Sequence, residues 1–436
     1  MNQEPSRRDA AANLRIEYVD ISLLKASAYN PRKWDAKAES HLMESLRKHG
    51  FCDPVIANSA ENRRNVLIGG HFRVHCAKKL GIETVPVVYV NIPDLKKEQD
   101  LNLRLNRNVG EWNLELLKAF DLDMLMDVGF DDTDLQNIWE GELEVDDDGF
   151  NIEKVLESIK DPITRPGDVY QLGAHRLVCG DATDPAVVAK LTDQKIVDMV
   201  YCDPPYNLAL DYNTGIGTSG KYGGLRTNDK KSPAEYREFI KKTIVNTLSI
   251  AKDDCHIFYW CDENQVGLLQ DLYRELGIRH KRVCLWVKNN ANLTPQVAFN
   301  KVYESCIYGT MGHPYLSEQK NLNEILNKEV GTGNSALYDI LDIIDIWVAR
   351  RLPTQDYEHP TEKPVTLHEK PLRRCTKIGD IVLDLMGGSG STLIACQQMK
   401  RRCLMVEWEP IFCDLIVKRF EALTGEKAKL LTSPNI

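Results

Sequence analysis

Short apolar runs alternate with amphipathic stretches through most of this chain, and that pattern predicts an α/β protein. In the first hundred residues, Leu42 and Leu46 share one face of a predicted helix that Asp35 caps and Gly50 ends. A second helix is expected from His71 to Leu80, directly after a Gly-Gly turn. Strands are expected at residues 16–19, 54–57, 65–68 and 85–90. These elements predict a small α/β domain.

The second half of the chain repeats this alternation on a larger scale. Apolar segments predict strands near residues 175–181, 196–200, 379–386 and 403–406, with helices through Met399 and from Phe412 to Leu423. In a doubly wound sheet, ligands bind just outside the carboxyl ends of the strands. Asp203 and Glu407 each follow one of these strands, so both are candidate site residues.

Acidic residues are concentrated in one segment of a chain whose net charge is −9. Residues 111–160 hold 16 Asp/Glu and 3 Lys/Arg, whereas residues 1–110 hold 13 and 18, and residues 161–436 hold 35 and 34. We interpret the acidic segment as a solvated spacer, which leaves the flanking domains free to offer basic surfaces to phosphates. The predicted parts are a disordered tail at 1–13, a domain at 14–110, a helical then acidic linker at 111–160, a large domain at 161–425 and a tail at 426–436.

Composition narrows the class of protein. No apolar run approaches the ~18–20 residues that span a bilayer, and the first residues lack the apolar core of a secretion signal. The 12 cysteines include no pair at metal-ligand spacing, so no metal site is expected. We therefore expect a cytoplasmic protein with reduced thiols.

The turn from Asp203 to Tyr206 carries the most specific chemistry. Pro204 and Pro205 stop the preceding strand and stiffen the turn. It offers one carboxylate, one backbone carbonyl and one aromatic ring. Two acceptors beside a flat face suit a planar ring that bears an amino group, such as adenine or cytosine. A purely structural Asp-Pro-Pro turn is the alternative.

A second motif lies far downstream, where a strand that ends near Asp384 runs into Gly387, Gly388 and Gly390. Glycines at a strand-to-helix turn let the backbone pass close to a ligand. Glu407 follows Gly387 by twenty residues, the spacing at which an acidic side chain meets a ribose. NAD, FAD and S-adenosylmethionine all fit this pattern. The turn departs from G-x-G-x-x-G and no P-loop lysine follows, so S-adenosylmethionine beside an amino-bearing base is the economical choice.

Residues 166–423 resemble the amino-group DNA methyltransferases of the β class. Five segments match in the order of that family: Cys179–Asp181, Val197–Asn207, His359–Val365, Asp384–Thr392 and Glu407–Pro410. The resemblance implies a Rossmann-like methyltransferase sheet that uses S-adenosylmethionine. The family usually has Pro-Phe after the Asp384 position, where this chain has Leu385-Met386.

The resemblance also implies residue roles. Asp203, Pro204, Pro205 and Tyr206 would act on a base flipped out of the duplex, with Tyr206 stacked on its face. Glu407 would take the ribose hydroxyls and Asp181 the cofactor adenine. The remaining implied cofactor residues are Asp384, Gly387, Gly388, Ser389, Gly390, Thr392 and Lys363. Target recognition is expected within residues 207–345, from the loop Gly215–Arg226 or from residues 289–345.

Residues 14–108 resemble the ParB/sulfiredoxin-like N-terminal domain, through Asn30–Arg32, Gly69–Arg73 and Val85–Val87. A glycine turn before a helix, with an arginine beside it, suits a phosphate. In that family, arginine-bearing motifs bind nucleotide phosphates or DNA. This implies that Arg32, Gly70, His71 and Arg73 contact such a ligand, and an inert or dimerising scaffold is the alternative.

Together these features predict a site-specific DNA methyltransferase that modifies the exocyclic N6 amine of adenine. Aspartate before Pro-Pro-Tyr favours adenine in the resembling family, and cytosine N4 is the nearest rival. A glutamine or RNA methyltransferase, and a binding regulator with an inactive methyltransferase domain, are the other classes. Double-stranded DNA is the expected partner, with a nucleotide at the N-terminal domain and a second copy of the chain as further candidates. A ParB-like unit fused to a methylase is typical of phage or prophage modification enzymes.

Overall fold

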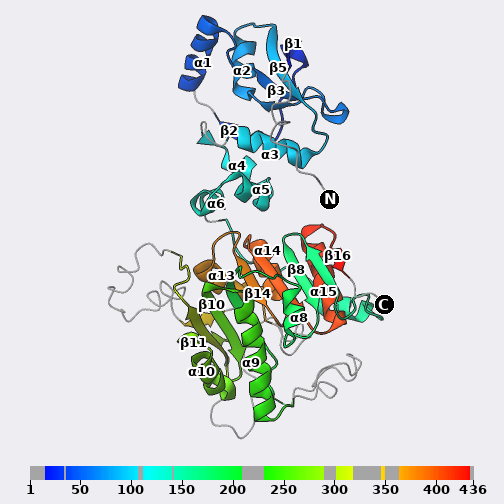
Figure 1. Ribbon diagram of the computed structural model, residues 1–436, viewed down its shortest axis with the longest axis vertical. Helices are drawn as coiled ribbons and strands as arrows, with labels where there is room; N and C mark the ends of the chain where they lie inside the picture. The colour runs from blue at the N-terminus through cyan, green and yellow to red at the C-terminus, as the bar shows by residue number, and fades with distance from the viewer. Residues whose placement is uncertain are drawn as a thin grey trace, which may run out of the picture. The chain divides into compact units, whose positions relative to one another are not determined.

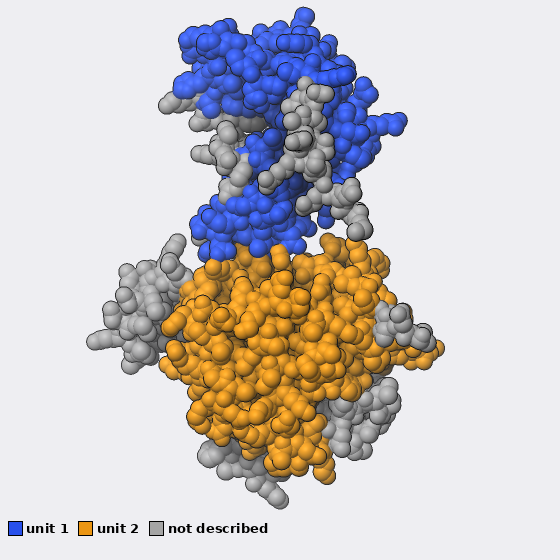
Figure 2. Space-filling model, viewed as in Figure 1, with its two compact units in different colours: residues 1–140 blue, residues 141–436 orange. Residues whose placement is uncertain are grey.

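The computed structural model describes residues 15–33, 36–106, 111–139, 142–208, 230–288, 301–317, 345–348 and 363–432. Two compact units divide the chain, Met1–Glu140 and Gly141–Ile436 (Figure 2). Residues 111–160 are therefore not a separate linker as predicted, because residues before 141 belong to the first unit and the rest to the second. Among the described residues, every helix is too short or too polar to cross a lipid bilayer.

The first unit contains a four-stranded mixed sheet in the order β1-β5-β3-β4. β3 pairs parallel with β5, whereas β1 and β4 pair antiparallel with their neighbours. Two helices, α1 and α2, contact each other, and Val74 and Ala77 of α2 pack on Val55, Leu67 and Val87 of the sheet. The predicted strands and second helix are confirmed. The bounds are β1 Ile16–Asp20, α1 Ala36–His49, β3 Val55–Asn58, β4 Leu67–Gly69, α2 His71–Lys79 and β5 Thr84–Val90.

Further helices extend this unit instead of forming a spacer. α3 packs on β4 and on α5, and α4 packs on α6. Leu117, Leu125 and Leu135 are fully buried at these contacts, which is why so acidic a segment still folds. Two short strands, β2 and β6, also pair with each other. The bounds are β2 Arg32–Lys33, α3 Leu95–Asn106, β6 Glu111–Trp112, α4 Leu114–Leu117, α5 Leu122–Val128 and α6 Asp132–Trp139.

The second unit is built on a ten-stranded sheet in the order β13-β11-β12-β10-β9-β14-β15-β8-β7-β16. The five central strands, from β10 to β8, run parallel. The bounds are β7 Val169–Leu172, β8 His175–Cys179, β9 Val197–Cys202, β10 Ala251–Cys261, β11 Arg279–Val287, β12 Tyr303–Met311, β13 Ile346–Val348, β14 Ile381–Asp384, β15 Arg402–Glu407 and β16 Lys429–Thr432.

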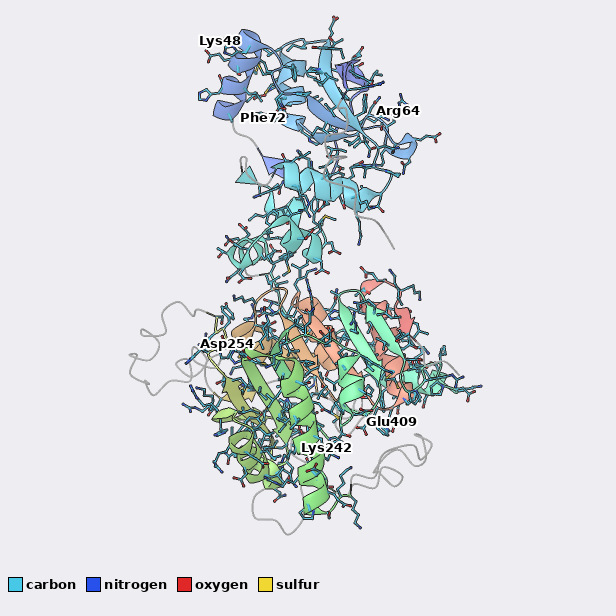
Figure 3. The ribbon with its side chains drawn as sticks, in the orientation of Figure 1. Lys48, Arg64, Phe72, Lys242, Asp254 and Glu409 are labelled. Atoms are coloured by element: carbon cyan, nitrogen blue, oxygen red, sulfur yellow. The ribbon has the colours of Figure 1, made fainter. Side chains whose placement is uncertain are left out.

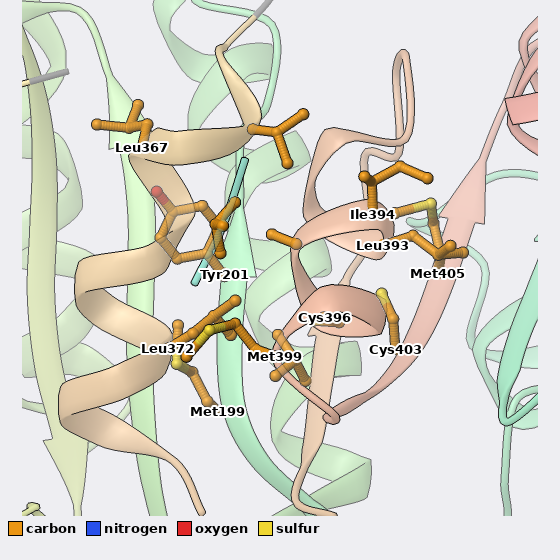
Figure 4. Packing of buried hydrophobic residues seen from close by; sticks show 14 of the residues in the cluster. Met199, Tyr201, Leu367, Leu372, Leu393, Ile394, Cys396, Met399, Cys403 and Met405 are labelled. Carbon is orange, nitrogen blue, oxygen red and sulfur yellow. The ribbon is translucent and has the colours of Figure 1, made fainter. Parts of the chain in front are cut away.

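Helices cover both faces of this sheet, so each central strand is apolar on both sides (Figure 1). Along β9, Met199 and Tyr201 point into one core, and Val200 and Cys202 into the other. The first core contains Leu372 of α13 and side chains of α14 (Figure 4). The helices are α7 Ile152–Ser158, α8 Pro185–Ala189, α9 Pro233–Ile250, α10 Val266–Glu275, α13 Glu369–Cys375, α14 Ser391–Gln398 and α15 Pro410–Thr424.

Two predictions about the ends of the second unit are wrong. The expected tail at 426–436 contains β16, which pairs antiparallel with β7 and so closes one edge of the sheet. In the predicted solvated spacer, Asp148 is not solvated, because Asp148 and Arg419 are each only 3% exposed and form a two-pronged ion pair of 2.6 and 2.8 Å. This buried pair ties the acidic segment to α15.

Candidate active site

A pocket of about 810 Å³ opens at the carboxyl ends of the central parallel strands. Residues after β8, β9, β14 and β15 line it, together with the start of α9. β9 and β14 are neighbours in the sheet, yet α9 and α14, which follow them, pack on opposite faces. Helices that diverge in this way leave a crevice at the ends of the two strands, which explains the position of the pocket.

The proline turn, Asp203–Tyr206, begins where β9 ends and forms one wall of the pocket. The Tyr236 hydroxyl of α9 donates to the Pro205 carbonyl at 2.9 Å. Asn207 adopts a left-handed backbone with φ of 59°, and its side chain exchanges hydrogen bonds of 2.9 and 2.6 Å with the Lys231 backbone. The turn is therefore braced by α9 and by the segment that precedes this helix.

Five side chains from separate parts of the chain form one network at this turn. The Tyr206 hydroxyl lies 2.9 Å from Asp203 Oδ1 and 3.1 Å from Glu304 Oε2. Lys363 Nζ forms an ion pair with Asp203, donates to the Tyr206 hydroxyl at 3.0 Å and lies 3.4 Å from Glu304 Oε2. Lys288 forms an ion pair with the other oxygen of Glu304. We call these five residues the lysine–carboxylate cluster.

The two carboxylates of the cluster differ in their affinity for a proton. Burial raises the pKa of Asp203, and the single ammonium of Lys363 offsets that rise only in part. Burial also favours the neutral form of Glu304, but Lys363 and Lys288 together outweigh it and lower its pKa to about 2. Lys363 is itself buried, and the charges of Asp203 and Glu304 nevertheless raise its pKa. At neutral pH the cluster therefore contains a permanently charged Glu304.

The glycine turn after β14 forms the opposite part of the site. Gly390 begins α14 with φ of 84°, a conformation that side chains disfavour. A Cβ on Gly387 would lie 2.7 Å from the Met405 sulfur, so only glycine fits against β15. Gly388 lines the pocket and turns its backbone N–H toward Glu407. The glycine pattern is thus explained by packing on β15 and by backbone conformation.

Glu407 stands at the end of β15 and lines the pocket. Its two carboxylate oxygens accept backbone N–H groups of Gly388 and Glu409 at 2.7 and 2.8 Å. Burial raises the pKa of Glu407 to about 7, even though both hydrogen bonds favour the charged form. The glycine turn and Glu407 are therefore one hydrogen-bonded unit.

The other predicted cofactor residues divide into two groups. Asp181 lines the pocket, and its Oδ1 accepts the backbone N–H and hydroxyl of Thr183, both at 2.8 Å. Asp384 and Thr392 are buried and do not line the pocket, and burial raises the pKa of Asp384 to about 6. Ser389 accepts hydrogen bonds from Arg419 and also lies outside the lining, as do Gly387 and Gly390. These residues belong to the glycine turn or pack against it, outside the pocket lining.

Several residues of the pocket were missed by the sequence reasoning. Trp408 lines it and is 49% exposed, and its position next to Glu407 is a signal that could have identified it. Phe412 of α15 and Phe239 and Lys242 of α9 also line the pocket. Figure 3 labels Lys242 on its helix. Leu385 and Met386 belong to the lining too, so the departure from Pro-Phe alters the pocket itself.

The predicted phosphate residues of the first unit lie near its second helix. Gly70 begins α2 with φ of 86°, and the His71 ring lies 2.7 Å from the Ser27 hydroxyl. Burial lowers the pKa of His71 to about 4, so its ring is neutral at pH 7. Arg73 donates to the Asp53 carbonyl at 2.7 Å and pairs with the Asp53 carboxylate. Arg32 forms β2 with Lys33, and its side chain lies outside the described part.

The predicted recognition loop Gly215–Arg226 lies outside the described residues, as do most of residues 289–345 and the segment from His359 to Glu362. Residues 301–317 are described, and they include Glu304. Of the described part of residues 289–345, only Glu304 lines the pocket.

The doubly wound sheet and its pocket define the class of protein. An acidic proline turn and a glycine turn bound to an acidic residue open into one cavity at the switch point of the sheet. This is the architecture of Rossmann-like methyltransferases that use S-adenosylmethionine. The predicted fold class and cofactor are confirmed.

The chain belongs to the DNA methylase family of the N6/N4 type, which matches residues 197–418. The ParB N-terminal domain family matches residues 6–109. The type II methyltransferase M2.DpnII of Streptococcus pneumoniae is 28% identical over 243 residues, which cover 52% of this chain and 83% of that protein. A probable chromosome-partitioning protein ParB of Treponema pallidum is 30% identical over 124 residues, 28% of this chain and 37% of that protein. The fused architecture is thereby confirmed.

Solved structures of similar fold are also found. The DNA methyltransferase M1.HpyAVI in complex with S-adenosylmethionine aligns with 56% of this chain and 97% of its own, at 18% identity and a TM-score of 0.39. The cytosine-N4-specific PvuII DNA methyltransferase aligns with 61% and 98%, at 12% identity and a TM-score of 0.42.

Proposed function

We propose that this chain transfers a methyl group from S-adenosylmethionine to the exocyclic N6 amine of adenine in double-stranded DNA. One observation carries the proposal: Asp203 lines the same cavity as Gly388 and Glu407. A methyl group therefore has a direct path between a cofactor held at the glycine turn and an amine held at the proline turn. Holding both groups in one cavity converts a bimolecular reaction into an effectively unimolecular one.

The cofactor end of the pocket suits the predicted ligand in size and chemistry. Glu407 would accept the ribose hydroxyls and Asp181 the adenine amino group, and the exposed ring of Trp408 offers an apolar surface beside them. Three further acidic side chains, Glu235, Glu238 and Glu409, line this cavity together with Lys231 and Lys242. The excess of acidic groups favours a cationic ligand. When bound, S-adenosylmethionine would supply an electrophilic methyl group.

The base end would act by orienting the amine. The Asp203 carboxylate and the Pro204 carbonyl would accept the two N–H groups of a flipped base, which draws the nitrogen lone pair out of the ring. Acceptors fixed before the reaction stabilise the positive charge that develops on nitrogen. No covalent intermediate with the protein is required. Tyr206 would pack against the base while its hydroxyl holds Asp203.

One feature of the sequence bears on whether the target base is adenine or cytosine. Aspartate at position 203, before Pro-Pro-Tyr, favours adenine in the β-class resemblance. Cytosine N4 is the second candidate, because its amino group could occupy the same acceptors. The raised pKa of Asp203 matters for both, since only the ionised carboxylate accepts two hydrogen bonds readily.

The decisive experiment is expression in a host free of DNA methylation, followed by base-resolution mapping of the modified DNA. We expect N6-methyladenine at one recognised site. In the Asp203→Ala variant, methylation should fall by about 10²–10³-fold or more, the loss typical of removing one group aimed at developing charge. S-adenosylmethionine binding should remain. Asp271→Ala, an exposed aspartate of α10, is the matched control.

Each alternative outcome has a distinct meaning. Detection of N4-methylcytosine at the mapped site would identify cytosine, instead of adenine, as the target base. Unmodified DNA together with intact S-adenosylmethionine binding would favour another amino-bearing substrate, such as RNA. The absence of both activities would favour a binding regulator. Unchanged methylation by Asp203→Ala would refute the assignment of the site.

The ParB-like unit is proposed to bind nucleic-acid or nucleotide phosphates at the start of α2, through Gly70, His71, Arg73 and Arg32. Arg73 is paired with Asp53, so a phosphate would have to replace that carboxylate. Arg73→Ala should weaken retention of nonspecific DNA or of a nucleoside triphosphate, measured by filter binding. Sedimentation of the full chain, with and without nucleotide, tests the proposed homodimer.

A further inference from the structure

Lys363 occupies a position in the pocket that the proposed reaction needs. Its side chain is 4% exposed, and its Nζ pairs with Asp203. The ammonium also lies 4.6 Å from the centre of the Trp260 ring and 5.4 Å from that of Tyr206. A cation thus sits on the carboxylate, among aromatic rings, where the amino group of a target base would have to bind.

Each oxygen of Asp203 already accepts one hydrogen bond in this arrangement. Lys363 takes Oδ2, and the Tyr206 hydroxyl lies 2.9 Å from Oδ1. A target amino group needs at least one of these oxygens, with a geometry in line with the methyl donor. A carboxylate oxygen can accept a second hydrogen bond. The positive charge of Lys363 nevertheless opposes the positive charge that develops on the amine, so the reaction is favoured when Lys363 has moved away from Asp203.

Glu304 offers the displaced ammonium a second carboxylate. Its Oε2 already lies 3.4 Å from Lys363 Nζ, so a small rotation of the lysine side chain would exchange one partner for the other. Glu304 is held in place from both sides, since Lys288 pairs with Oε1 and the Tyr206 hydroxyl lies 3.1 Å from Oε2. An ammonium that had no such partner would be left buried without a counter-ion, which is strongly unfavourable.

We propose that Glu304 is a positioning residue that receives the Lys363 ammonium when the target base enters, and that Lys363 holds the place of the base at Asp203 until then. This inference rests on the proposed function. The lysine keeps the Asp203 carboxylate paired in the free enzyme, and Glu304 keeps the buried lysine paired in the complex. The Asp203 carboxylate and the Lys363 ammonium therefore each have a partner both before and after the base enters.

Binding of duplex DNA tests this inference without relying on turnover. The probe is a fluorescent duplex that carries the mapped site, titrated by anisotropy in the presence of S-adenosylhomocysteine. We expect Glu304→Gln to weaken binding of this duplex about tenfold. The same duplex with the target base removed should bind wild type and variant equally, because no amino group then competes with Lys363. Glu263→Gln, a half-exposed carboxylate outside the cluster, is the matched control.

A double-mutant cycle separates this role from a structural one. In Lys363→Gln there is no ammonium to relocate, so adding Glu304→Gln should change the affinity for the intact duplex less than twofold. A tenfold loss in that background, or an equal loss on the abasic duplex, would overturn the inference. Thermal denaturation and S-adenosylmethionine titration check that each variant is folded. If wild-type enzyme methylates no DNA, the proposed function fails first. If it methylates normally while Glu304→Gln binds like wild type, only this inference fails.

Discussion

The buried ion pair between Asp148 and Arg419 links an acidic stretch of the sequence to the stability of the second unit. Both side chains are 3% exposed, and the guanidinium makes two parallel hydrogen bonds to the carboxylate. Asp148→Ala would remove the carboxylate partner of a buried guanidinium, which also donates to the carbonyl and hydroxyl of Ser389. Removing one partner of a buried pair typically costs about 3–5 kcal/mol. We expect a loss of that size in the unfolding free energy of the second unit.

Urea denaturation of the full chain measures this loss. Tryptophan fluorescence reports both units, because Trp260, Trp286 and Trp347 lie in the core of the second unit and Trp112 and Trp139 belong to the first. The transition that Asp148→Ala shifts is assigned to the second unit. The two units need not unfold together, so the midpoint and slope are fitted to that transition alone. At a slope of about 2 kcal/mol per molar urea, the midpoint should fall by roughly 1.5–2.5 M.

The neighbouring Asp146 supplies the matched control for this experiment. Its side chain is exposed, and only its backbone bonds with Gln398. Asp146→Ala should therefore change the unfolding free energy by less than about 0.5 kcal/mol. Because Arg419 also holds the Ser389 carbonyl of the glycine turn, Asp148→Ala should weaken S-adenosylmethionine binding as well. A loss of less than about 1 kcal/mol in the unfolding free energy of Asp148→Ala would refute this reasoning. It would mean that the pair is not buried, or that another group takes the place of Asp148 beside Arg419.

Two further predictions concern the cofactor end of the pocket. Burial raises the pKa of Glu407 from 4.5 to about 7, so the folded state holds its proton more tightly than the unfolded state. Its contribution to stability is complete below pH 4.5 and is lost as the pH rises to about 7, which amounts to roughly 3 kcal/mol. Glu407→Gln should remove that part of the pH dependence of the unfolding free energy, measured from pH 4.5 to 8, and an unchanged profile would contradict the assignment. Trp408→Ala should leave the melting temperature nearly unchanged, because the ring is 49% exposed, yet weaken S-adenosylmethionine binding about five- to tenfold by calorimetry. Equal affinity would place the cofactor away from Trp408.

The sequence predicts those parts of the fold that depend on local pattern. β9 and β14 are apolar apart from Asp198 and the terminal Asp384, because helices cover both faces of the sheet, and such runs are visible without a structure. The proline turn and the glycine turn are equally local, since each lies at the end of one strand. Their meeting in one pocket was expected because strands that run parallel end at the same edge.

Glu304 could not be predicted in this way. It lies inside β12, and Tyr206 is 98 residues away in the chain. Only the antiparallel pairing of β12 with β10 and β11 brings it to the edge of the pocket. A single glutamate at the start of an apolar strand looks like a solvent-facing residue. For Asp148 the sequence predicts the wrong environment. A run of three aspartates suggests exposure to solvent, whereas Asp148 is buried against Arg419, which is 271 residues away in the chain.

The charges of the site are graded along the pocket, and this gradient suits a reaction between a cationic donor and a neutral amine. Glu304 is neutralised by two lysines and Asp203 by one, all at the proline turn. Among the described residues no lysine forms an ion pair with Glu407 or Asp384, and burial raises their pKa values to about 7 and 6. A positive charge is therefore stabilised at the glycine turn, where binding it favours ionisation of both acids. At the proline turn the charge is already balanced, so the charge that develops on an amine is stabilised only after Lys363 has moved to Glu304.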